Sequence, residues 1–507
     1  MLSILLFISL CCAHATKEHN YPTKKHGWSV FDINYGQWSE VIERDICVVG
    51  GGASGVHAAV SFLHYNKTVV VVEQNDRLGG HTHTYIDPET NGLVDIGVVI
   101  FLPLEVVYDA FSTFDVPLLN LSSIQPNTPG QPANTSLPAI AFQTFRKDVD
   151  FRDGTDVVRQ TYTAAEVTEA FQRLTDVLSQ YDYILHGYDL PDPVPEDLYL
   201  PFGAFIEKYN ATAAFPTIYA VSQGMGDLLH VSTIYAVKYY NVMDIRALTQ
   251  GYLAQAQGNT SELYTRAGDF LTSKNVLLQS TVISTNRRKN TGHPSTQDGR
   301  AELLVSTRNE GLKLLSCKQV VLAIPPELSN LDGWDLTDQE HEVFSTYKSA
   351  NGYWTGLVRN VGLNQTLTIW NAAASTPFNI PVLPALYSLS PVGVIDDVWS
   401  IKFAADVPTM TDDEVKSYVE REIQTIQRSQ NATLTTPEWL IFETHNPMHL
   451  QVSSKDIKNG FFKRLTALQG GLDGTMFYTG AAFHTHYSSL LWRFNREVLL
   501  PKMMEFW

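Results

Sequence analysis

The sequence predicts an α/β protein in which one part is built from parallel strands and helices and the other is a mixed α+β region. Near the N-terminus, two continuous apolar runs at residues 45–49 and 68–73 flank a segment of small residues at 53–65. Continuous apolar runs are typical of strands buried on both faces, and this strand–helix–strand order is typical of a parallel βαβ unit. The chain has 507 residues, of which 44% are apolar and 18% charged, which is enough for two large domains.

The first residues have the pattern of a targeting signal. Residues 2–12 are apolar, but the run is too short for a membrane-spanning helix, which needs about 20 residues. Ala13-His14-Ala15 follows and offers the small-x-small site that signal peptidase accepts. A buried N-terminal helix is the alternative, but polar residues follow at once at 16–20. We expect a signal peptide at residues 1–15, a secreted or secretory-pathway protein, and no membrane span in the remaining chain.

Other sequence features agree with this location. Asn-x-Ser/Thr sequons are acceptors for N-linked glycans in secreted proteins. The predicted glycosylation sites are Asn66, Asn120, Asn134, Asn210, Asn259, Asn364 and Asn431. The formal charge is -17, with 36 Lys and Arg against 53 Asp and Glu. So acidic a chain repels phosphate backbones, and we expect no nucleic-acid partner.

Two cysteines are left once the signal peptide is removed. Cys47 and Cys317 lie in or beside apolar runs of strand character. A free cysteine in such a place behaves as a small apolar residue. We expect both to be reduced thiols in the core, with no disulfide between them.

The remaining elements are predicted from apolar spacing and flanking polar residues. Apolar residues at helical spacing indicate amphipathic helices, and short apolar runs bounded by polar loops indicate strands. The predicted elements are helices at 164–178 and 251–271, strands at 276–285, 301–306 and 318–324, a mixed α/β region at 331–450, and a strand that runs into an amphipathic helix at 477–507.

A dinucleotide fingerprint follows the first strand. Gly50, Gly52 and Gly55 form G-x-G-x-x-G between that strand and the helix. The first glycine permits a tight turn, the second lets backbone approach a pyrophosphate, and the third lets the helix pack closely on the strand. Free N–H groups at the helix start then face the phosphates. Glu73 ends the second strand, where a carboxylate accepts hydrogen bonds from the ribose hydroxyls. The pattern predicts a Rossmann-like domain that binds NAD or FAD.

The residues after Glu73 favour FAD. Arg77-Leu78-Gly79-Gly80 supplies a glycine pair beside which an extended cofactor can run, and Asp95-Ile96-Gly97 follows. In this order, the motifs resemble those of the flavin-containing amine oxidoreductases. The strand that contains Val282, the run KQVVLAIPP at 318–326, and Tyr478-Thr479-Gly480 resemble three later motifs of that family. The resemblance implies FAD as cofactor and a glutathione-reductase-type, amine-oxidase-like FAD-binding domain interleaved with a mixed α+β substrate domain.

Within that superfamily, the chain is most similar to the fungal β-cyclopiazonate dehydrogenase group. Residues 79–85, GGHTHTY, and 94–101, VDIGVVIF, carry this similarity. It implies FAD-dependent oxidation of a small molecule in fungal secondary metabolism, with O2 or another electron acceptor. The similarity does not carry the substrate over.

The motifs divide the chain into discontinuous domains. We assign residues 42–105, 232–330 and 470–507 to the FAD-binding domain, and residues 106–231 and 331–469 to the substrate domain. The predicted cofactor-binding residues are Gly50, Gly52, Ser54, Gly55, Glu73, Arg77, Gly79, Gly80, His81, Val282, Gly480, Ala481 and His484.

The chain departs from the family pattern at three places. His81 follows the glycine pair, where amine oxidases usually have arginine, and Ala481 follows Gly480, where the family often has an acid. No cysteine follows Cys317, which excludes flavin attachment to a C-terminal cysteine.

The pairs His81-x-His83 and His484-x-His486 leave several interpretations open. His81 and His484 are candidates for contact with FAD or for covalent attachment to it. Alternatively, the histidines cap loops and bond to backbone. Two pairs on strand faces could also form a four-histidine metal site, but no carboxylate accompanies them at ligand spacing, so we expect no metal.

Catalytic residues are predicted from the family chemistry and from aromatic side chains. Lys348 is a candidate for the lysine that many amine oxidases place near the flavin, and an exposed surface lysine is the alternative. Tyr353 and Trp354 follow in an aromatic strand and could line a substrate pocket or pack in the core. We expect an FAD oxidoreductase that takes hydride from a small organic substrate. The alternatives are a monooxygenase or isomerase on the same scaffold, and a non-catalytic flavin-fold binding protein, which Ala481 favours.

Overall fold

The structure is a computed structural model that describes residues 38–125, 128–129, 137–287, 299–446 and 448–507. The predicted signal peptide and the sequon at Asn134 lie outside these residues. In the part of the chain that the structure describes, no helix is long and apolar enough to cross a membrane.

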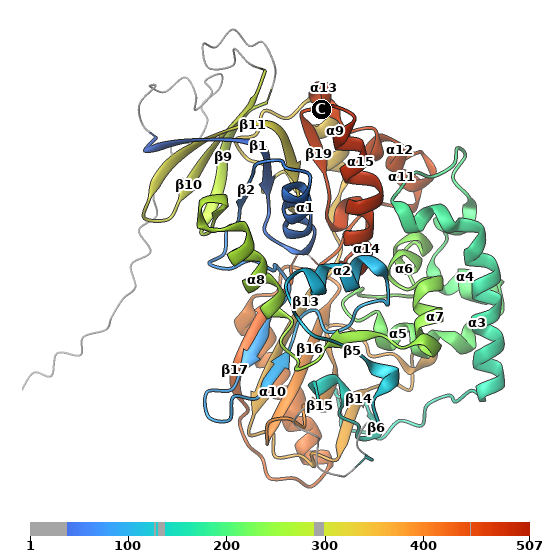
Figure 1. Ribbon diagram of the computed structural model, residues 1–507. Helices are drawn as coiled ribbons and strands as arrows, with labels where there is room; N and C mark the ends of the chain where they lie inside the picture. Colours follow the sequence, from blue (N-terminus) through green and yellow to red (C-terminus); the bar gives the residue numbers. More distant parts are fainter. Residues whose placement is uncertain (1–37, 126–127, 130–136, 288–298, 447) are drawn as a thin grey trace, which may run out of the picture.

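The predicted parallel unit forms the centre of a seven-stranded sheet (Figure 1). Its strands lie in the order β8-β2-β1-β11-β10-β9, and β19 pairs with β11. Strands β8, β2, β1, β11 and β19 are parallel, whereas β10 runs antiparallel to β9 and β11. The bounds are β1 (Glu40–Val49), β2 (Val69–Val72), β8 (Val276–Leu277), β9 (Ser280–Asn286), β10 (Ala301–Thr307), β11 (Gly311–Leu322) and β19 (Met476–Tyr478).

The apolar runs of β1 and β2 are continuous because both faces of these strands are buried. Ile46, Val48, Val69 and Val71 pack in one core with the helices α1 (Ala53–His64), α8 (Ser261–Leu271) and α14 (Ser488–Phe494). The alternate residues, Cys47, Val49, Val70 and Val72, pack in a second core that continues into a layer of helices. This confirms the predicted βαβ unit and its parallel strands.

Strand β11 is longer than predicted, and this length joins two parts of the sheet. Along one edge, residues 313–322 pair with β1. Along its other edge, residues 311–317 pair with β10 and residues 320–322 pair with β19. The C-terminal strand therefore enters the same sheet as the N-terminal βαβ unit.

Cys47 and Cys317 form a disulfide between β1 and β11, with their Cα atoms 5.8 Å apart. The prediction of two reduced core thiols is therefore wrong. Each cysteine is indeed completely buried in an apolar strand, but the two strands are neighbours in the sheet. The sequence separation of 270 residues conceals this contact.

The predicted helix at 251–271 is only partly correct. Residues 253–255 form the strand β7 (Leu253–Gln255), which pairs with β5 (Leu118–Asn120), and the helix α8 begins only at Ser261. Asp95 sets this start, because its carboxylate accepts hydrogen bonds from Thr260 N at 2.9 Å and Thr260 Oγ1 at 2.7 Å. A helix N-terminus needs such an acceptor for its free N–H groups.

A second, six-stranded sheet carries the other half of the fold, in the order β17-β13-β16-β15-β14-β6. Its pairs are antiparallel except β14 with β6. The helix α10 (Asp412–Ser429) packs on its outer face. The bounds are β6 (Phe145–Val149), β13 (Gly352–Arg359), β14 (Leu367–Asn371), β15 (Ala385–Pro391), β16 (Val398–Ala405) and β17 (Glu438–Thr444).

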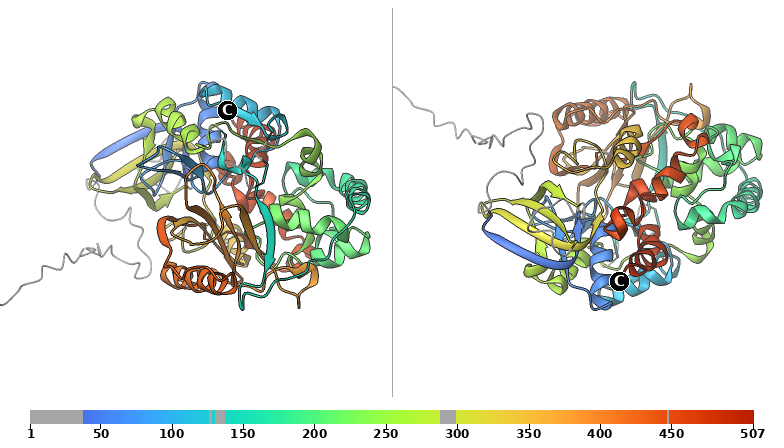
Figure 2. Two further views of the ribbon diagram at one scale, coloured as in Figure 1. Left: turned by 90° about the horizontal axis from the view of Figure 1, so that it is seen from below. Right: turned by 90° about the horizontal axis from the view of Figure 1, so that it is seen from above.

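A layer of helices flanks the two sheets on one side (Figures 1 and 2). The predicted helix at 164–178 is confirmed in full as α3, and a Thr163–Glu166 capping box fixes its start. The remaining helices are α2 (Glu105–Thr113), α3 (Ala164–Leu178), α4 (Phe202–Lys208), α5 (Phe215–Val221), α6 (Thr233–Tyr239), α7 (Val242–Gln250), α9 (Asp338–Thr346), α11 (Ser454–Lys458), α12 (Phe461–Thr466), α13 (Gly471–Gly474) and α15 (Leu500–Met504). The remaining strands are β3 (Thr84–Ile86), β4 (Leu93–Asp95), β12 (Lys348–Ser349) and β18 (Leu450–Gln451).

Candidate functional site

The glycine-rich loop after β1 is held by Glu73. The Gly51 N–H donates to Glu73 Oε2 at 2.7 Å, and the Asn75 N–H donates to Oε1 at 2.8 Å. The Glu73 side chain is buried. The carboxylate predicted for the ribose therefore also fixes the loop that faces the pyrophosphate in this motif.

Glycines are required where two loops and the helix α1 approach each other. A Cβ on Gly55 would lie 1.9 Å from the Gly50 carbonyl oxygen, so only glycine lets α1 pack this closely on β1. A Cβ on Gly52 would meet the Gly80 Cα at 3.8 Å, and one on Gly480 would meet Ser54 Oγ at 3.6 Å. The loops of Gly52, Gly80 and Gly480 thus face one another at the start of α1, an arrangement that suits an extended dinucleotide such as FAD.

Arg77 holds the second glycine loop. Its guanidinium donates to the carbonyl oxygens of Thr82 at 2.8 Å and Gly80 at 2.9 Å, and also contacts His83. Gly79 and Gly80 have φ angles of 111° and 55°, which favour glycine. The structure therefore assigns Arg77 the role of shaping the loop that faces Gly52.

Val282 is the residue whose strand is predicted to hold the adenine. It is buried in β9, two residues beyond Ser280, whose N–H donates to the Glu73 carbonyl oxygen at 2.8 Å. The start of β9 is thereby brought beside the ribose-binding end of β2. Adenine recognition by this backbone stays a prediction.

Five histidines from distant segments form a histidine cluster. Its members are His81, His83, His445, His449 and His486. The ring centroids of His81 and His445 are 4.7 Å apart, and those of His81 and His486 are 6.1 Å apart in a stacked arrangement. Since His81 follows Gly80 and His486 follows the Gly480 loop, the cluster lies at the end of the cofactor cradle.

Four histidines of the cluster, His81, His445, His449 and His486, are held largely neutral. Burial lowers the pKa of His81 and of His449 to about 4 each, although the His81 ring keeps access to solvent. Burial and the neighbouring histidines keep the pKa values of His445 and His486 well below the usual value. At neutral pH these rings offer N–H donors and nitrogen acceptors without carrying charge.

The sequence predictions for histidine are met only in part. His81 lies in the cluster, but it is His486, and not His484, that packs against it. His484 is buried beside Phe494, with ring centroids 5.4 Å apart, and neither ring nitrogen has a hydrogen-bond partner among the described residues. His445 and His449, in HNPMHL at 445–450, were not singled out, because their only signal is the pair of histidines itself.

The three predicted catalytic residues lie in different surroundings. Trp354 points to the outer face of the second sheet and packs in the core beneath α10. Tyr353 points to the opposite face, where its ring lies 5.7 Å from that of His445 and packs with Tyr387. Lys348 is exposed in β12. Only Tyr353 lies beside the histidine cluster.

A lysine that the sequence interpretation missed shares the face of Tyr353. Lys402 in β16 is paired with Thr355 of β13, and Thr355 Oγ1 lies 2.8 Å from His445 Nε2. Partners in adjacent antiparallel strands project to the same side, so Lys402 faces the side of the sheet on which the cluster lies. Lys402 is half-buried, and burial lowers its pKa.

No set of three or more His, Cys, Asp or Glu side chains is arranged to hold a metal ion in the described ranges of the chain. The rings of the histidine cluster pack edge to face, as in His81 with His445, or stacked, as in His81 with His486. The cluster is therefore better suited to hydrogen bonding than to coordination.

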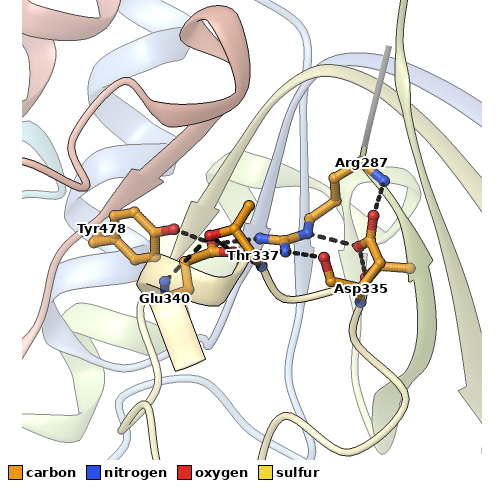
Figure 3. A network of polar contacts seen from close by, with 6 residues as sticks. Arg287, Asp335, Thr337, Glu340 and Tyr478 are labelled. Carbon is orange, nitrogen blue, oxygen red and sulfur yellow. Dashed lines mark hydrogen bonds and ion pairs between the residues drawn. The ribbon is translucent and has the colours of Figure 1, made fainter. Parts of the chain in front are cut away.

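A buried ionic network supports the C-terminal glycine loop (Figure 3). Arg287, whose side chain is 0% exposed, contacts Asp335 at 2.8 Å and Glu340 at 2.7 Å. The Tyr478 hydroxyl donates to Glu340, and Gly480 follows two residues later. The network thus fixes the strand that presents Gly480 to the cofactor cradle.

Buried titratable groups predict a maximum of stability near pH 6.5. Burial lowers the pKa values of His57, His445, His449, His484 and His486. The unfolded chain therefore binds more protons between about pH 4 and 6.5, and stability rises with pH there. Burial raises the pKa values of Asp95, Asp244 and Glu422 to about 6, 7 and 8, which opposes this rise and lowers stability above pH 6.5.

Thermal unfolding midpoints measured from about pH 4.5 to 8.5 check this expectation, since five histidines outweigh three carboxyls at roughly 1.4 kcal/mol per group and pH unit. The H445Q/H486Q variant should flatten the acidic limb, while an exposed H230Q variant leaves it unchanged. An unfolding temperature that decreases as the pH is raised from about 4.5 to 6.5 would contradict the expectation.

Comparisons with known proteins agree with this geometry. Residues 48–114 match the model of the NAD(P)-binding Rossmann-like domain family. The chain is 39% identical over 476 residues to the FAD-dependent oxidoreductase oblC of Cochliobolus heterostrophus, with 92% of each chain covered. It is 33% identical over 469 residues to the β-cyclopiazonate dehydrogenase of Aspergillus oryzae, with 91% of this chain and 93% of the relative covered.

Solved structures share the fold at low sequence identity. A fatty acid isomerase from P. acnes that produces conjugated linoleic acid superposes with a TM-score of 0.67 at 17% identity, over 90% of this chain and 98% of the isomerase. A putrescine oxidase double mutant superposes with a TM-score of 0.60 at 14% identity, over 92% and 100% of the two chains. These likenesses confirm the amine-oxidase-like fold.

Proposed function

Since this chain belongs to the family of fungal FAD-dependent oxidoreductases that includes β-cyclopiazonate dehydrogenase, we propose that it oxidises a small organic metabolite by hydride transfer to FAD, in fungal secondary metabolism. The observation that carries the proposal is the approach of three glycine loops to one another, since Gly52 faces Gly80 and Gly480 faces Ser54 at the start of α1. The histidine cluster and the polar face of the second sheet lie at the end of this cradle.

The residues of the chain divide the work between cofactor and substrate. When FAD is bound, it supplies the acceptor for a hydride and passes the electrons to O2 or another acceptor. Glu73 and the glycine loops would hold the dinucleotide portion, and Tyr353 and the histidine cluster would face the substrate. Neutral imidazoles there can take up or hand on the proton that substrate oxidation releases.

The first test is an absorbance spectrum of the purified protein before and after acid precipitation. Yellow flavin bands are expected. Bands lost to the supernatant would mean non-covalent FAD, and bands that stay with the pellet would mean covalent attachment and direct attention to His81. A protein that shows no flavin bands even after added FAD would refute the proposal and favour the non-catalytic binding protein.

The E73A variant should reduce the FAD content of the purified protein by at least about tenfold. It removes the acceptor of the buried Gly51 N–H and of the partly buried Asn75 N–H, as well as the predicted ribose ligand, and loss of the buried bond alone costs roughly 1–3 kcal/mol. Bound flavin per protein, measured by absorbance, checks this. The E89A variant is the matched control, because Glu89 is exposed in the same domain. Equal flavin content in the two variants would contradict the assignment of Glu73.

The alternatives on the same scaffold are separated by their products. An oxidase releases peroxide in proportion to product, a monooxygenase inserts oxygen, and an isomerase consumes neither O2 nor an external acceptor. Measurement of O2 uptake and peroxide per turnover distinguishes the three.

We further propose that the protein passes through the secretory pathway. The disulfide between Cys47 and Cys317 supports this, because such bonds persist mainly in oxidising compartments. Exposed sequons at Asn66, Asn210, Asn364 and Asn431 also support it. N-terminal sequencing, which should begin at Thr16, and a mobility shift on treatment with N-glycosidase test the proposal.

A further inference from the structure

One face of the second sheet forms a polar floor beneath the histidine cluster. Four neighbouring strands place Glu443, Thr355, Lys402 and Ser388 opposite one another in a single row. Thr355 contacts His445, which fixes the side to which this row projects. The opposite face is apolar and packs against α10. The polar floor is therefore a row of polar side chains on one face of a sheet whose other face is apolar.

Lys402 is the cation of this floor that lacks a counter-charge. Its side chain is half-buried, and this burial lowers its pKa. No carboxylate among the described residues counteracts that effect. Its cross-strand neighbours, Thr355 and Ser388, are buried hydroxyl residues. A desolvated ammonium without an anion is unfavourable, so this position gains stability when an anion arrives.

The other charges around the floor are already engaged or lie apart. Glu443 pairs with His83 at 3.2 Å. The Arg77 guanidinium is bonded to carbonyl oxygens of its own loop. Asp406 follows the end of β16 and is exposed. The neutral rings of His81, His445, His449 and His486 add donors without charge.

Aromatic side chains border the polar floor. Tyr353 and Tyr387 pack together with Met448 and Ala404, and Tyr219 packs against Tyr387 with ring centroids 5.8 Å apart. These surfaces suit a flat, unsaturated body. A ligand that meets both regions has an unsaturated body and one negatively charged oxygen.

We propose that the substrate of this site carries an acidic oxygen, as an enolate or carboxylate, and that Lys402 pairs with this oxyanion while neutral histidines donate hydrogen bonds to it. This rests on the proposed function and specifies its substrate class. The amine-oxidase-like fold would instead suggest an amine substrate. A protonated amine does not suit this site, because it would meet the unpaired ammonium of Lys402.

The test uses three probes of similar size and different charge, namely benzoate, benzyl alcohol and benzylamine. Each is titrated into the FAD-loaded protein near neutral pH by isothermal calorimetry. Benzoate should bind at least about tenfold more tightly than benzyl alcohol, and benzylamine more weakly than either. The K402M variant should lose about tenfold or more in benzoate affinity and change little for benzyl alcohol, while K402R retains most of the benzoate affinity.

The K348M variant is the matched control, because Lys348 is exposed in β12. Tighter binding of benzylamine than of benzoate would overturn the proposal. Failure of benzoate to bind at concentrations up to about 10 mM would also overturn the proposal, since a Kd of that size corresponds to only about 3 kcal/mol of binding free energy. An equal loss of affinity for benzoate and for benzyl alcohol in the K402M variant would overturn it as well. Flavin content, read before each titration, reports separately on the proposed function, since a flavin-free protein would refute that function and leave the preference between the probes measurable.

Discussion

Substitution of Arg287 by methionine should destabilise the protein by about 3–5 kcal/mol, because it leaves a buried carboxylate without its counter-charge. Glu340 is only 3% exposed and receives two guanidinium hydrogen bonds, at 2.7 and 3.0 Å. Burial opposes ionisation of Glu340, yet the Arg287 guanidinium holds its pKa below the usual value. The chemical denaturation midpoint measures the loss, and FAD retention should fall with it, since Tyr478 connects the network to Gly480.

The double variant R287M/E340Q provides the control for this prediction. It removes both charges, so it should recover part of the stability that R287M loses. The E342Q variant removes an exposed carboxylate from the same helix and should change stability by no more than about 0.5 kcal/mol. A double variant less stable than R287M would show that the uncompensated charge is not the cause.

Removal of the disulfide in the C47S/C317S variant should cost about 2–5 kcal/mol. The bond closes a loop of 270 residues, which restricts the unfolded chain strongly in the chain-entropy model. Cys47 also lies three residues before Gly50, so loosening of β1 should release FAD more readily. Thermal midpoints and the rate of flavin release, measured side by side, check both effects.

A C47A/C317A variant separates the loss of the bond from the burial of serine hydroxyls, since alanine brings no polar atom into the core. Treatment of the parent protein with a reductant under mild denaturation should reproduce the shift in midpoint. An unchanged midpoint in both variants would mean that the bond adds nothing to stability.

Local residue patterns were enough to predict the elements that build the cofactor domain. The strands around α1, the three glycines of the fingerprint and Glu73 are confirmed in position, because a tight turn, a close helix and a buried strand each restrict the residue types within a few positions. The helix at 164–178 was predicted in full for the same reason, since its capping residues and apolar spacing are local. The interleaved α/β fold followed from the order of such motifs.

Only the tertiary structure decided which distant residues meet. Residues 253–255 form a strand because β5 lies beside them, although their apolar spacing fits a helix. Tyr353 and Trp354 are adjacent in sequence but face opposite sides of the sheet, and only the position of α10 shows which side is core. The disulfide, the histidine cluster and the placement of Lys402 all join segments tens to hundreds of residues apart. Such contacts depend on strand order and register, and no short-range pattern of residue types encodes these.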